Sequence, residues 1–370
     1  MKIPIIRPSV RFDDVAADIR TVLDSGILTN GPFLAQFEAE LAAAVGVRHA
    51  VATTSATTAM HLVLAAAEIG PGDEVLVSDF TFPATGNVVV ERGAVPVLVD
   101  CEPGGFRLDL DDADRRVTAK TKALLVVDPF GQPAMSTELL EWAAARRLLV
   151  IEDAACALGS SREGVACGAW PEAPGCFSFH PRKVVTTGEG GAVTTDDDEF
   201  AARLRLLRSH GGAPGPAIGL SFVAHGFNYR MSELQAVLGL DQLRRLDAIR
   251  ADRQATAARY EKRLGAIQSV GLVTPPAGEE WSYQSFVVLV DERDDIVTAL
   301  RDLGIETTLG TYALHAQPVF GPLGYAPGDL PESFDRQQRS LTLPLLPEMT
   351  SEQVDEVIAA ISAIIGARRA

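Results

Sequence analysis

The sequence predicts an α/β fold with a large domain followed by a smaller α+β domain. From about residue 48 to residue 195, short apolar segments alternate with segments of helical composition. A long helical run, Ser232–Leu264, then leads to a C-terminal part with strand and helix patterns of its own. At 370 residues the chain exceeds what one hydrophobic core usually holds. We therefore expect a large domain with the N-terminal segment over residues 1–245 and a small domain over residues 246–370.

The apolar segments of the first part predict buried parallel strands, because each is short, rich in β-branched residues and flanked by Gly, Pro or Asp. The predicted strands are Val75–Ser78, Val95–Asp100, Ala123–Val127 and Leu148–Glu152. The predicted helices between and after them are Ala56–Ile69, Pro83–Arg92, Met135–Arg146 and Phe200–Arg208. In the C-terminal part we expect strands at Gln284–Val290 and Ile305–Thr308 and an amphipathic helix at Ser351–Ile365. In such a layout ligands bind at the carboxyl ends of the parallel strands.

Composition and charge exclude several classes of protein. The formal net charge of −16 argues against non-specific binding of nucleic acid. No run of about 20 apolar residues occurs, so no membrane span is expected, and a cytoplasmic location is the simplest interpretation. The four cysteines contain no C-x-x-C pair, so neither a zinc site nor a disulfide framework is indicated and no metal is expected.

Lys183 is the first candidate for chemistry. It lies between two apolar segments, Cys176–Phe179 and Ala192–Thr195, and follows Ser178 at the end of the first. An exposed loop lysine is the ordinary interpretation, but three glycines follow closely: Gly188, Gly190 and Gly191. A lysine in a buried site can lose its proton and attack a carbonyl group to form a Schiff base. The glycines would let the backbone pass close to a bulky cofactor.

Three further segments could complete a cofactor site. Asp153 follows a predicted strand, where it could cap a helix or hold the pyridine nitrogen of pyridoxal 5′-phosphate (PLP) in the protonated state. The segment Thr53–Ala59 is a hydroxyl-rich turn that runs into a helix and could bind phosphate or simply cap the helix. Phe82 could belong to the core or lie against a cofactor ring. Taken together with Lys183, these segments predict a PLP site. A phosphate-binding NTPase is excluded, because no G-x-x-x-x-G-K-[ST] motif occurs and Lys183 precedes the glycines.

The chain resembles the DegT/StrS-type sugar aminotransferases, which are PLP enzymes of fold type I. The resemblance covers nearly the whole chain and rests on motifs in family order. These are SGILTNGP (25–32), GPGDEVLV (70–77), FTFPAT (80–85), IEDAA (151–155), FSFHPRK (177–183) with TTGEGG (186–191), GFNYRMSELQA (226–236), LHAQP (314–318) and LTLPLLP (341–347). The fold that the resemblance implies is aspartate-aminotransferase-like. It has a mostly parallel sheet of roughly seven strands between helices and a smaller C-terminal α+β domain.

The resemblance also implies roles for individual residues. Lys183 matches the lysine that binds the cofactor and then moves the proton. Asp153 matches the partner of the pyridine nitrogen, Phe82 the residue stacked on the ring, and Ser178 a phosphate ligand. The remaining cofactor contacts that it implies are Ala56, Thr57, Cys156 and Asn228. Asn228 matches a residue that reaches the phosphate in the neighbouring subunit, so a homodimer with shared active sites is expected.

Three positions depart from the family pattern. The phosphate turn has Ala56 where glycine is common, and Cys156 stands where Gln or His is frequent. Upstream of His315 the chain has Leu309-Gly310-Thr311-Tyr312 where the family often has a His-Tyr-Pro run. This region shapes the substrate pocket, so the acceptor stays open. The candidate substrate contacts are Thr29, His180, Tyr312 and His315.

The activity implied is transfer of an amino group from L-glutamate or L-glutamine to a keto group of a nucleotide-linked deoxysugar, with Lys183 as the general base. A cyclitol or another natural-product ketone is an alternative acceptor and requires the same chemistry. PLP-dependent sugar dehydration is a further alternative, but that branch has histidine where this chain has Lys183. A role without catalysis would not require Lys183 and Asp153, and both are present.

Overall fold

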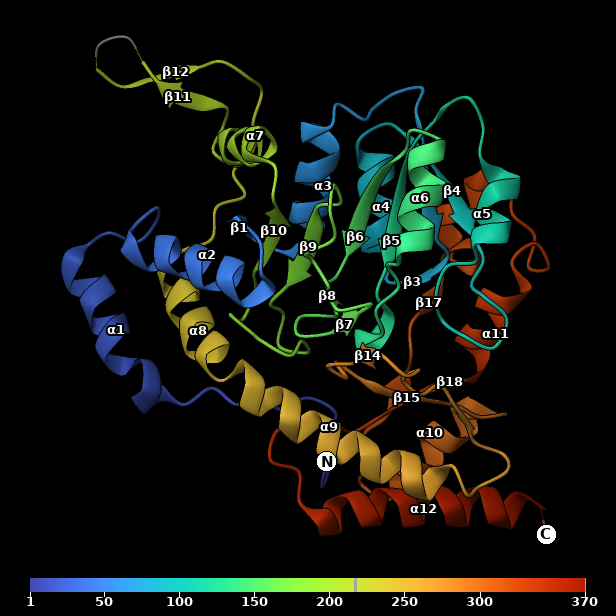
Figure 1. Cartoon of the computed structure of the whole chain (residues 1–370). Helices are drawn as coiled ribbons and strands as arrows, with labels where there is room; N and C mark the ends of the chain where they lie inside the picture. The colour runs from blue at the N-terminus through green and yellow to red at the C-terminus, as the bar shows by residue number, and fades with distance from the viewer. Residues whose placement is uncertain (216–217, 370) are drawn as a thin grey trace.

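A seven-stranded sheet forms the centre of the larger part of the molecule in the computed structural model, which describes residues 1–215 and 218–369 (Figure 1). The order of its strands is β1-β10-β9-β6-β5-β2-β4. Their bounds are β1 His49–Thr53, β2 Glu74–Ser78, β4 Val95–Val99, β5 Thr121–Val127, β6 Leu149–Asp153, β9 Gly175–Ser178 and β10 Gly191–Thr195. All run parallel except β10, which is antiparallel to both of its neighbours. The predicted α/β class with a mostly parallel sheet is confirmed.

Helices cover both faces of this sheet, because side chains along each buried strand alternate between two apolar cores. Val75 and Val77 pack in one core with α3 (Ala56–Ala66), α4 (Ala84–Glu91) and α7 (Asp198–Arg208). Leu76 and Leu124 face the opposite side, which α5 (Leu110–Arg116) and α6 (Thr137–Ala145) cover. Helices α2 (Pro32–Val45) and α8 (Glu233–Arg244) cover the same side over β1 and β9. The strands are therefore packed between two layers of helices.

The C-terminal part has its own sheet and core. The predicted helical run over Ser232–Leu264 is two helices, α8 and α9 (Leu246–Leu264), which meet at the non-helical Arg245. The second sheet has the order β13-β15-β18-β16. Its strands are β13 Gly271–Leu272, β15 Phe286–Leu289, β16 Thr308–Leu309 and β18 Ser340–Leu343, and its helices are α10 Arg293–Asp302 and α12 Ser351–Arg369. The strand expected at Ile305–Thr308 begins only at Thr308, and Ile305 instead bridges to Ile3 of the N-terminal segment. Ile3 is buried in this second core.

Several short elements were not predicted. Strand β3 (Phe80–Thr81) pairs with β17 (Tyr312–Ala313) and so joins the two parts of the molecule. Strands β7 (Ser161–Arg162), β8 (Val165–Ala166) and β14 (Glu279–Glu280) form a second junction. The other elements are α1 Phe12–Ser25, α11 Pro331–Arg339 and the 3₁₀ turns Pro129–Gly131, Leu314–Ala316 and Pro318–Leu323.

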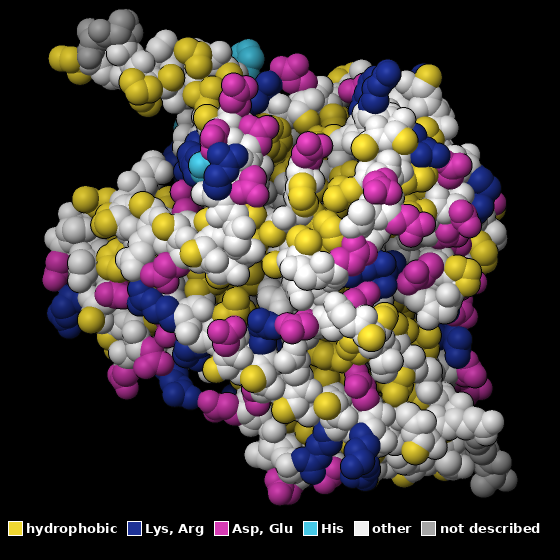
Figure 2. Space-filling view, viewed as in Figure 1, with side chains coloured by type: hydrophobic (Ala, Val, Ile, Leu, Met, Phe, Trp, Pro, Cys, Tyr) yellow, Lys and Arg dark blue, Asp and Glu magenta, His cyan; other side chains and the backbone are white. Residues whose placement is uncertain are grey.

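A hairpin of β11 (Gly212–Pro214) and β12 (Leu220–Phe222) projects away from the body beyond α7 (Figure 1). Apolar side chains are exposed along it (Figure 2), among them Leu220, Phe222 and Val223. Among the described helices, none is both long and apolar enough to cross a membrane.

Candidate active site

A cavity of about 490 Å³ lies at the carboxyl ends of the parallel strands. The ends of β5, β6 and β9, the N-terminus of α3 and the β3–α4 connection all contribute to its lining. Gln284 and Gly310 from the C-terminal part line it as well. Its volume falls in the range of sites that bind a small molecule or cofactor.

Lys183 enters this cavity from the turn that follows β9. The turn is held by backbone hydrogen bonds, in which the N–H of Lys183 donates to the carbonyl oxygen of His180 at 2.9 Å and the N–H of Phe179 donates to that of Gly190 at 2.8 Å. The Nζ atom of Lys183 donates to the Sγ atom of Cys156 at 3.1 Å. In the described part of the chain, no carboxylate forms an ion pair with Lys183. Its amine is therefore available to a ligand.

Asp153 ends β6 and lies in the same cavity with 5% of its surface exposed. Its Oδ2 atom accepts a hydrogen bond from Oγ1 of Thr85 at 2.9 Å, and its Oδ1 atom accepts one from the N–H of Ala155 at 3.2 Å. Burial raises the pKa of Asp153, while the hydrogen bond from Thr85 and the charge of Lys183 act in the opposite direction. A cationic ring nitrogen beside this carboxylate would favour its ionised form.

The N-terminus of α3 offers a phosphate site. The N–H groups in the first turn of a helix have no acceptor inside the helix. Ser55 accepts the N–H of Thr58 at 3.1 Å, which leaves those of Ala56 and Thr57, both of which line the cavity. Ser178, at the end of β9, lines it too. Together with the helix dipole these groups favour an anion.

Gly191 is required for this arrangement. A Cβ atom at Gly191 would lie 2.3 Å from the carbonyl carbon of Ser55 and 2.5 Å from the nitrogen of Ala56. Only glycine therefore lets β10 begin against the start of α3.

Eight of the twelve predicted site residues line the cavity: Ala56, Thr57, Phe82, Asp153, Cys156, Ser178, His180 and Lys183. Phe82 is 65% exposed at the cavity wall, so its ring is available to a ligand. The ring of His180 accepts the N–H of Arg182 on Nδ1, at 3.2 Å, and burial lowers the pKa of His180.

Four predicted residues do not line the cavity of their own chain. Thr29 and Asn228 are exposed, in the α1–α2 connection and beside the β11–β12 hairpin. Tyr312 is half-buried, with its ring centroid 6.5 Å from that of Phe82.

The side chain of His315 is fully buried, with its Nδ1 atom 2.6 Å from Oδ2 of Asp79. Burial lowers the pKa of His315, but the hydrogen bond with Asp79 and the charge of that carboxylate outweigh burial and raise it overall. The structure therefore places His315 in a buried pair rather than in the cavity wall.

Sequence reasoning missed several residues of the site. Thr85 lies in the FTFPAT segment without an assigned role, although it is the direct partner of Asp153. Arg182, Glu189 and Gln284 also line the cavity. Gln284 lies 102 residues after Arg182, whose carbonyl oxygen it binds at 2.8 Å, and no local pattern indicates such a contact.

These groups fit PLP, which needs an amine for its aldehyde, a carboxylate for its ring nitrogen and N–H donors for its phosphate. Lys183, Asp153 and the start of α3 supply these in one cavity. With the seven-stranded sheet, they define a PLP-dependent enzyme of fold type I.

Comparison with known proteins identifies the family. The model of the DegT/DnrJ/EryC1/StrS aminotransferase family matches residues 12–362, and the chain belongs to this family. It is 39% identical to GDP-perosamine synthase of Caulobacter vibrioides over 343 residues, which cover 90% of this chain and 91% of that protein.

Solved structures agree with this assignment. DesV of S. venezuelae, in complex with a ketimine intermediate, is 34% identical, with a TM-score of 0.92 and 98% of each chain covered. Spr1654 of Streptococcus pneumoniae, named a putative sugar aminotransferase and solved in its PLP form, is 26% identical, with a TM-score of 0.92 and 99% of each chain covered. The protein is a PLP-dependent aminotransferase.

Proposed function

We propose that this aminotransferase moves an amino group from L-glutamate or L-glutamine to a keto group of a nucleotide-linked deoxysugar. The observation that carries the proposal is that Lys183, with no ion-pair partner among the described residues, shares one cavity with Asp153 and the start of α3. The names of two relatives, GDP-perosamine synthase and a sugar aminotransferase, support a sugar-linked acceptor. We also propose that the enzyme acts in the cytoplasm.

The chain's own residues would hold and orient the cofactor, which when bound supplies an electron sink for the substrate carbon. Ala56, Thr57 and Ser178 would bind its phosphate. Asp153, oriented by Thr85, would keep a proton on the ring nitrogen. Phe82 would lie against the ring, where an exposed aromatic surface at the cavity wall is available.

Lys183 would do the acid–base work. When its Nζ atom is not bonded to the cofactor, it would serve as the base that takes a proton from the substrate carbon and returns it to another atom. Cys156, which accepts a hydrogen bond from Nζ at 3.1 Å, would hold the free amine near that position. Once Lys183 has taken up the proton, its positive charge would also lower the pKa of Asp153 and help to keep it ionised.

The acceptor would enter between the two parts of the molecule. Gly310 and Thr311 from the C-terminal part line the cavity together with Phe82 and His180 from the large one. The ring of Tyr312, the next residue along the chain, lies beside that of Phe82. A sugar ring would bind among these residues.

We further propose a homodimer in which each cavity receives residues from both chains. Asn228 is exposed and does not line the cavity of its own chain. It lies beside the β11–β12 hairpin, whose strand β12 exposes Leu220 and Phe222. Exposed apolar side chains on a projecting arm favour burial against another chain. A second copy is the simplest partner, because two-fold homodimers are the commonest oligomers.

The acceptor is tested by supplying L-glutamate or L-glutamine with a panel of nucleotide-linked keto-deoxysugars and cyclitol ketones. Mass spectrometry of the products should show an aminated nucleotide sugar. Amination of a cyclitol ketone alone would contradict the proposed acceptor, and loss of water without nitrogen uptake would indicate sugar dehydration.

A further inference from the structure

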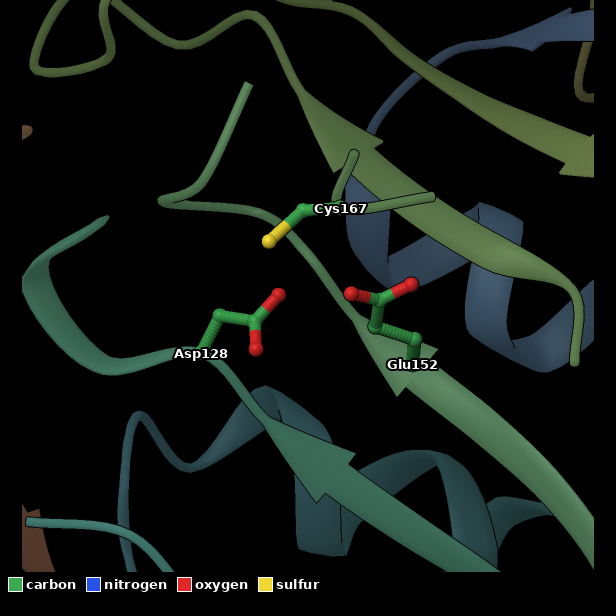
Figure 3. Close-up of side chains that lie close together, drawn as sticks. All are labelled: Asp128, Glu152 and Cys167. Atoms are coloured by element: carbon green, nitrogen blue, oxygen red, sulfur yellow. The ribbon is translucent and has the colours of Figure 1, made fainter. Parts of the chain in front are cut away.

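Two buried carboxyl groups lie beside each other behind the proposed site (Figure 3). Asp128 follows the last residue of β5, and Glu152 directly precedes Asp153 on the neighbouring strand β6. Neither has any exposed surface. Carboxylate oxygens of both lie within 4.8 Å of each other and of the Sγ atom of Cys167. The proposed mechanism uses none of these three groups.

Each carboxyl group has one satisfied and one unsatisfied oxygen. Asp128 Oδ1 accepts the N–H of Ala134 at 2.7 Å, and Glu152 Oε2 accepts the N–H of Gly168 at 2.7 Å. Asp128 Oδ2 and Glu152 Oε1 are buried and have no hydrogen-bond partner among the described groups, although the thiol of Cys167 lies within 4.8 Å of both carboxyl groups. Figure 3 shows the two carboxyl groups facing each other between the strand ends. A single proton placed between these groups would supply the missing donor.

The surroundings do not offer a compensating charge. No described Lys, Arg or His forms an ion pair with Asp128 or Glu152. The titratable groups near the pair are Asp153 and the thiols of Cys167 and Cys176, which are neutral or negative. Two buried carboxylates without a cation would be strongly unfavourable. Burial raises the pKa of both groups, and for Glu152 the charge of Asp128 raises it further.

The pair is also coupled to Asp153 through the backbone. The N–H of Asp128 donates to the carbonyl oxygen of Asp153 at 3.1 Å, and Val127 is the register partner of Asp153. The side chain of Asp128 meets that of Glu152, the residue next to Asp153. The end of β5 therefore contacts the end of β6 twice, once through the backbone and once through the carboxyl pair.

We propose that Asp128 and Glu152 share one proton, and that this proton bridge fixes the end of β6 so that Asp153 keeps its orientation in the cavity. The shared proton is a property of the protein without cofactor, whereas the positioning role rests on the proposed function of Asp153. The two are tested separately, so that failure of the proposed function leaves the test of the shared proton valid.

Infrared difference spectroscopy of the cofactor-free protein tests the shared proton. Glu152→Gln replaces the bridge by an amide that donates to an ionised Asp128. The spectrum of the wild type minus that of Glu152→Gln at pH 7.5 should contain a protonated-carboxyl C=O band that shifts in D2O. Absence of this band would overturn the shared proton. So would a stoichiometric divalent cation in the purified protein, measured by plasma mass spectrometry, because the cation would replace the proton between the carboxylates.

The positioning role is tested by the rate at which cofactor-loaded protein reacts with the amino donor. Glu152→Gln keeps a hydrogen-bonded bridge and should stay within about threefold of the wild type. Glu152→Ala should still bind the cofactor but react at least about tenfold more slowly, because displacement of a catalytic group is costly. Equal rates for Glu152→Ala and the wild type would overturn the positioning role.

Two controls keep this test decisive. If Glu152→Ala does not fold, Glu152→Met fills the same space without a hydrogen-bonding group and takes its place. A merely structural role predicts that Glu152→Met lowers the melting temperature but leaves the rate unchanged. If the wild type itself does not react with any donor, the proposed function fails and the infrared result still stands.

Discussion

The ionisation of Asp153 depends on opposing effects of its neighbours and its burial. Its burial favours the neutral carboxyl form, whereas the hydroxyl of Thr85, the N–H of Ala155 and the charge of Lys183 favour the ionised form. Thr85 is itself held by Thr81 at 3.1 Å. The ionisation of Asp153 therefore depends on neighbours that can be changed one at a time.

Replacing Asp153 by Asn should slow the reaction with the amino donor by about 100-fold or more, because the amide cannot hold a proton on the ring nitrogen. Binding of PLP should persist through Lys183 and the phosphate groups at the start of α3. Stopped-flow absorbance of the loaded variant measures the rate. A rate equal to that of the wild type would show that Asp153 has no part in the chemistry.

Binding of PLP should weaken as the pH falls, because the raised pKa of Asp153 means that its carboxylate is ionised only above that value. Thr85→Val removes the hydrogen bond that lowers this pKa. The fall in PLP affinity at low pH, the acid limb of the pH profile, should therefore move to higher pH by about one unit. Titration of PLP affinity against pH measures both effects. Asp153→Asn is the matched control and should lack the limb, and an unchanged limb in this control would assign it to another group.

At the scale of elements, the phosphate site depends on how closely β10 approaches α3. The N–H groups of Ala56 and Thr57 are directed by the capping box of Ser55 and Thr58, while Gly191 fixes the distance to the next strand.

Gly191→Ala should weaken PLP binding and destabilise the protein by about 1–3 kcal/mol, because its Cβ atom would overlap the backbone of Ser55 and Ala56. Melting temperature and PLP affinity check the two effects. Gly366→Ala, in α12 and without atoms near its Cβ position, is the matched control and should be neutral or slightly stabilising. Normal PLP affinity in Gly191→Ala would mean that the start of α3 does not bind the phosphate.

At the scale of the whole molecule, predicted site residues that lie outside the cavity bear on how two chains would associate. Asn228 and Thr29 lie on exposed segments, and the β11–β12 hairpin presents apolar side chains away from its own chain (Figure 2). In a dimer with shared sites these segments would complete the partner's cavity.

Complementation between variants tests the shared site. Lys183→Ala and Asn228→Ala should each have low activity alone. A mixed dimer of the two should regain activity, because the subunit that keeps Lys183 receives Asn228 from its partner. Co-expression with two affinity tags isolates the mixed dimer, and a mixed dimer no more active than its parents would contradict the shared site.

The ends of the strands in the large sheet, and the candidate site residues close to them, could be predicted from the sequence. Asp153 and Ser178 were found because each ends a strand, where parallel sheets bind ligands. Lys183 was found because it follows β9 and three glycines come soon after it. His315 could not be placed, because its partner Asp79 is 236 residues away and no local pattern links them. The β11–β12 hairpin was missed for a related reason, since its apolar side chains face outward and resemble neither a core strand nor a polar turn.

Absorbance spectroscopy with PLP tests the central claim, that Lys183 binds the cofactor and moves the proton. The wild type should develop the yellow band of lysine-bound PLP, and L-glutamate or L-glutamine should bleach it to the amine form of the cofactor. Lys183→Ala should show neither change. A wild type that never develops the band, or a Lys183→Ala variant that bleaches as fast as the wild type, would contradict the account.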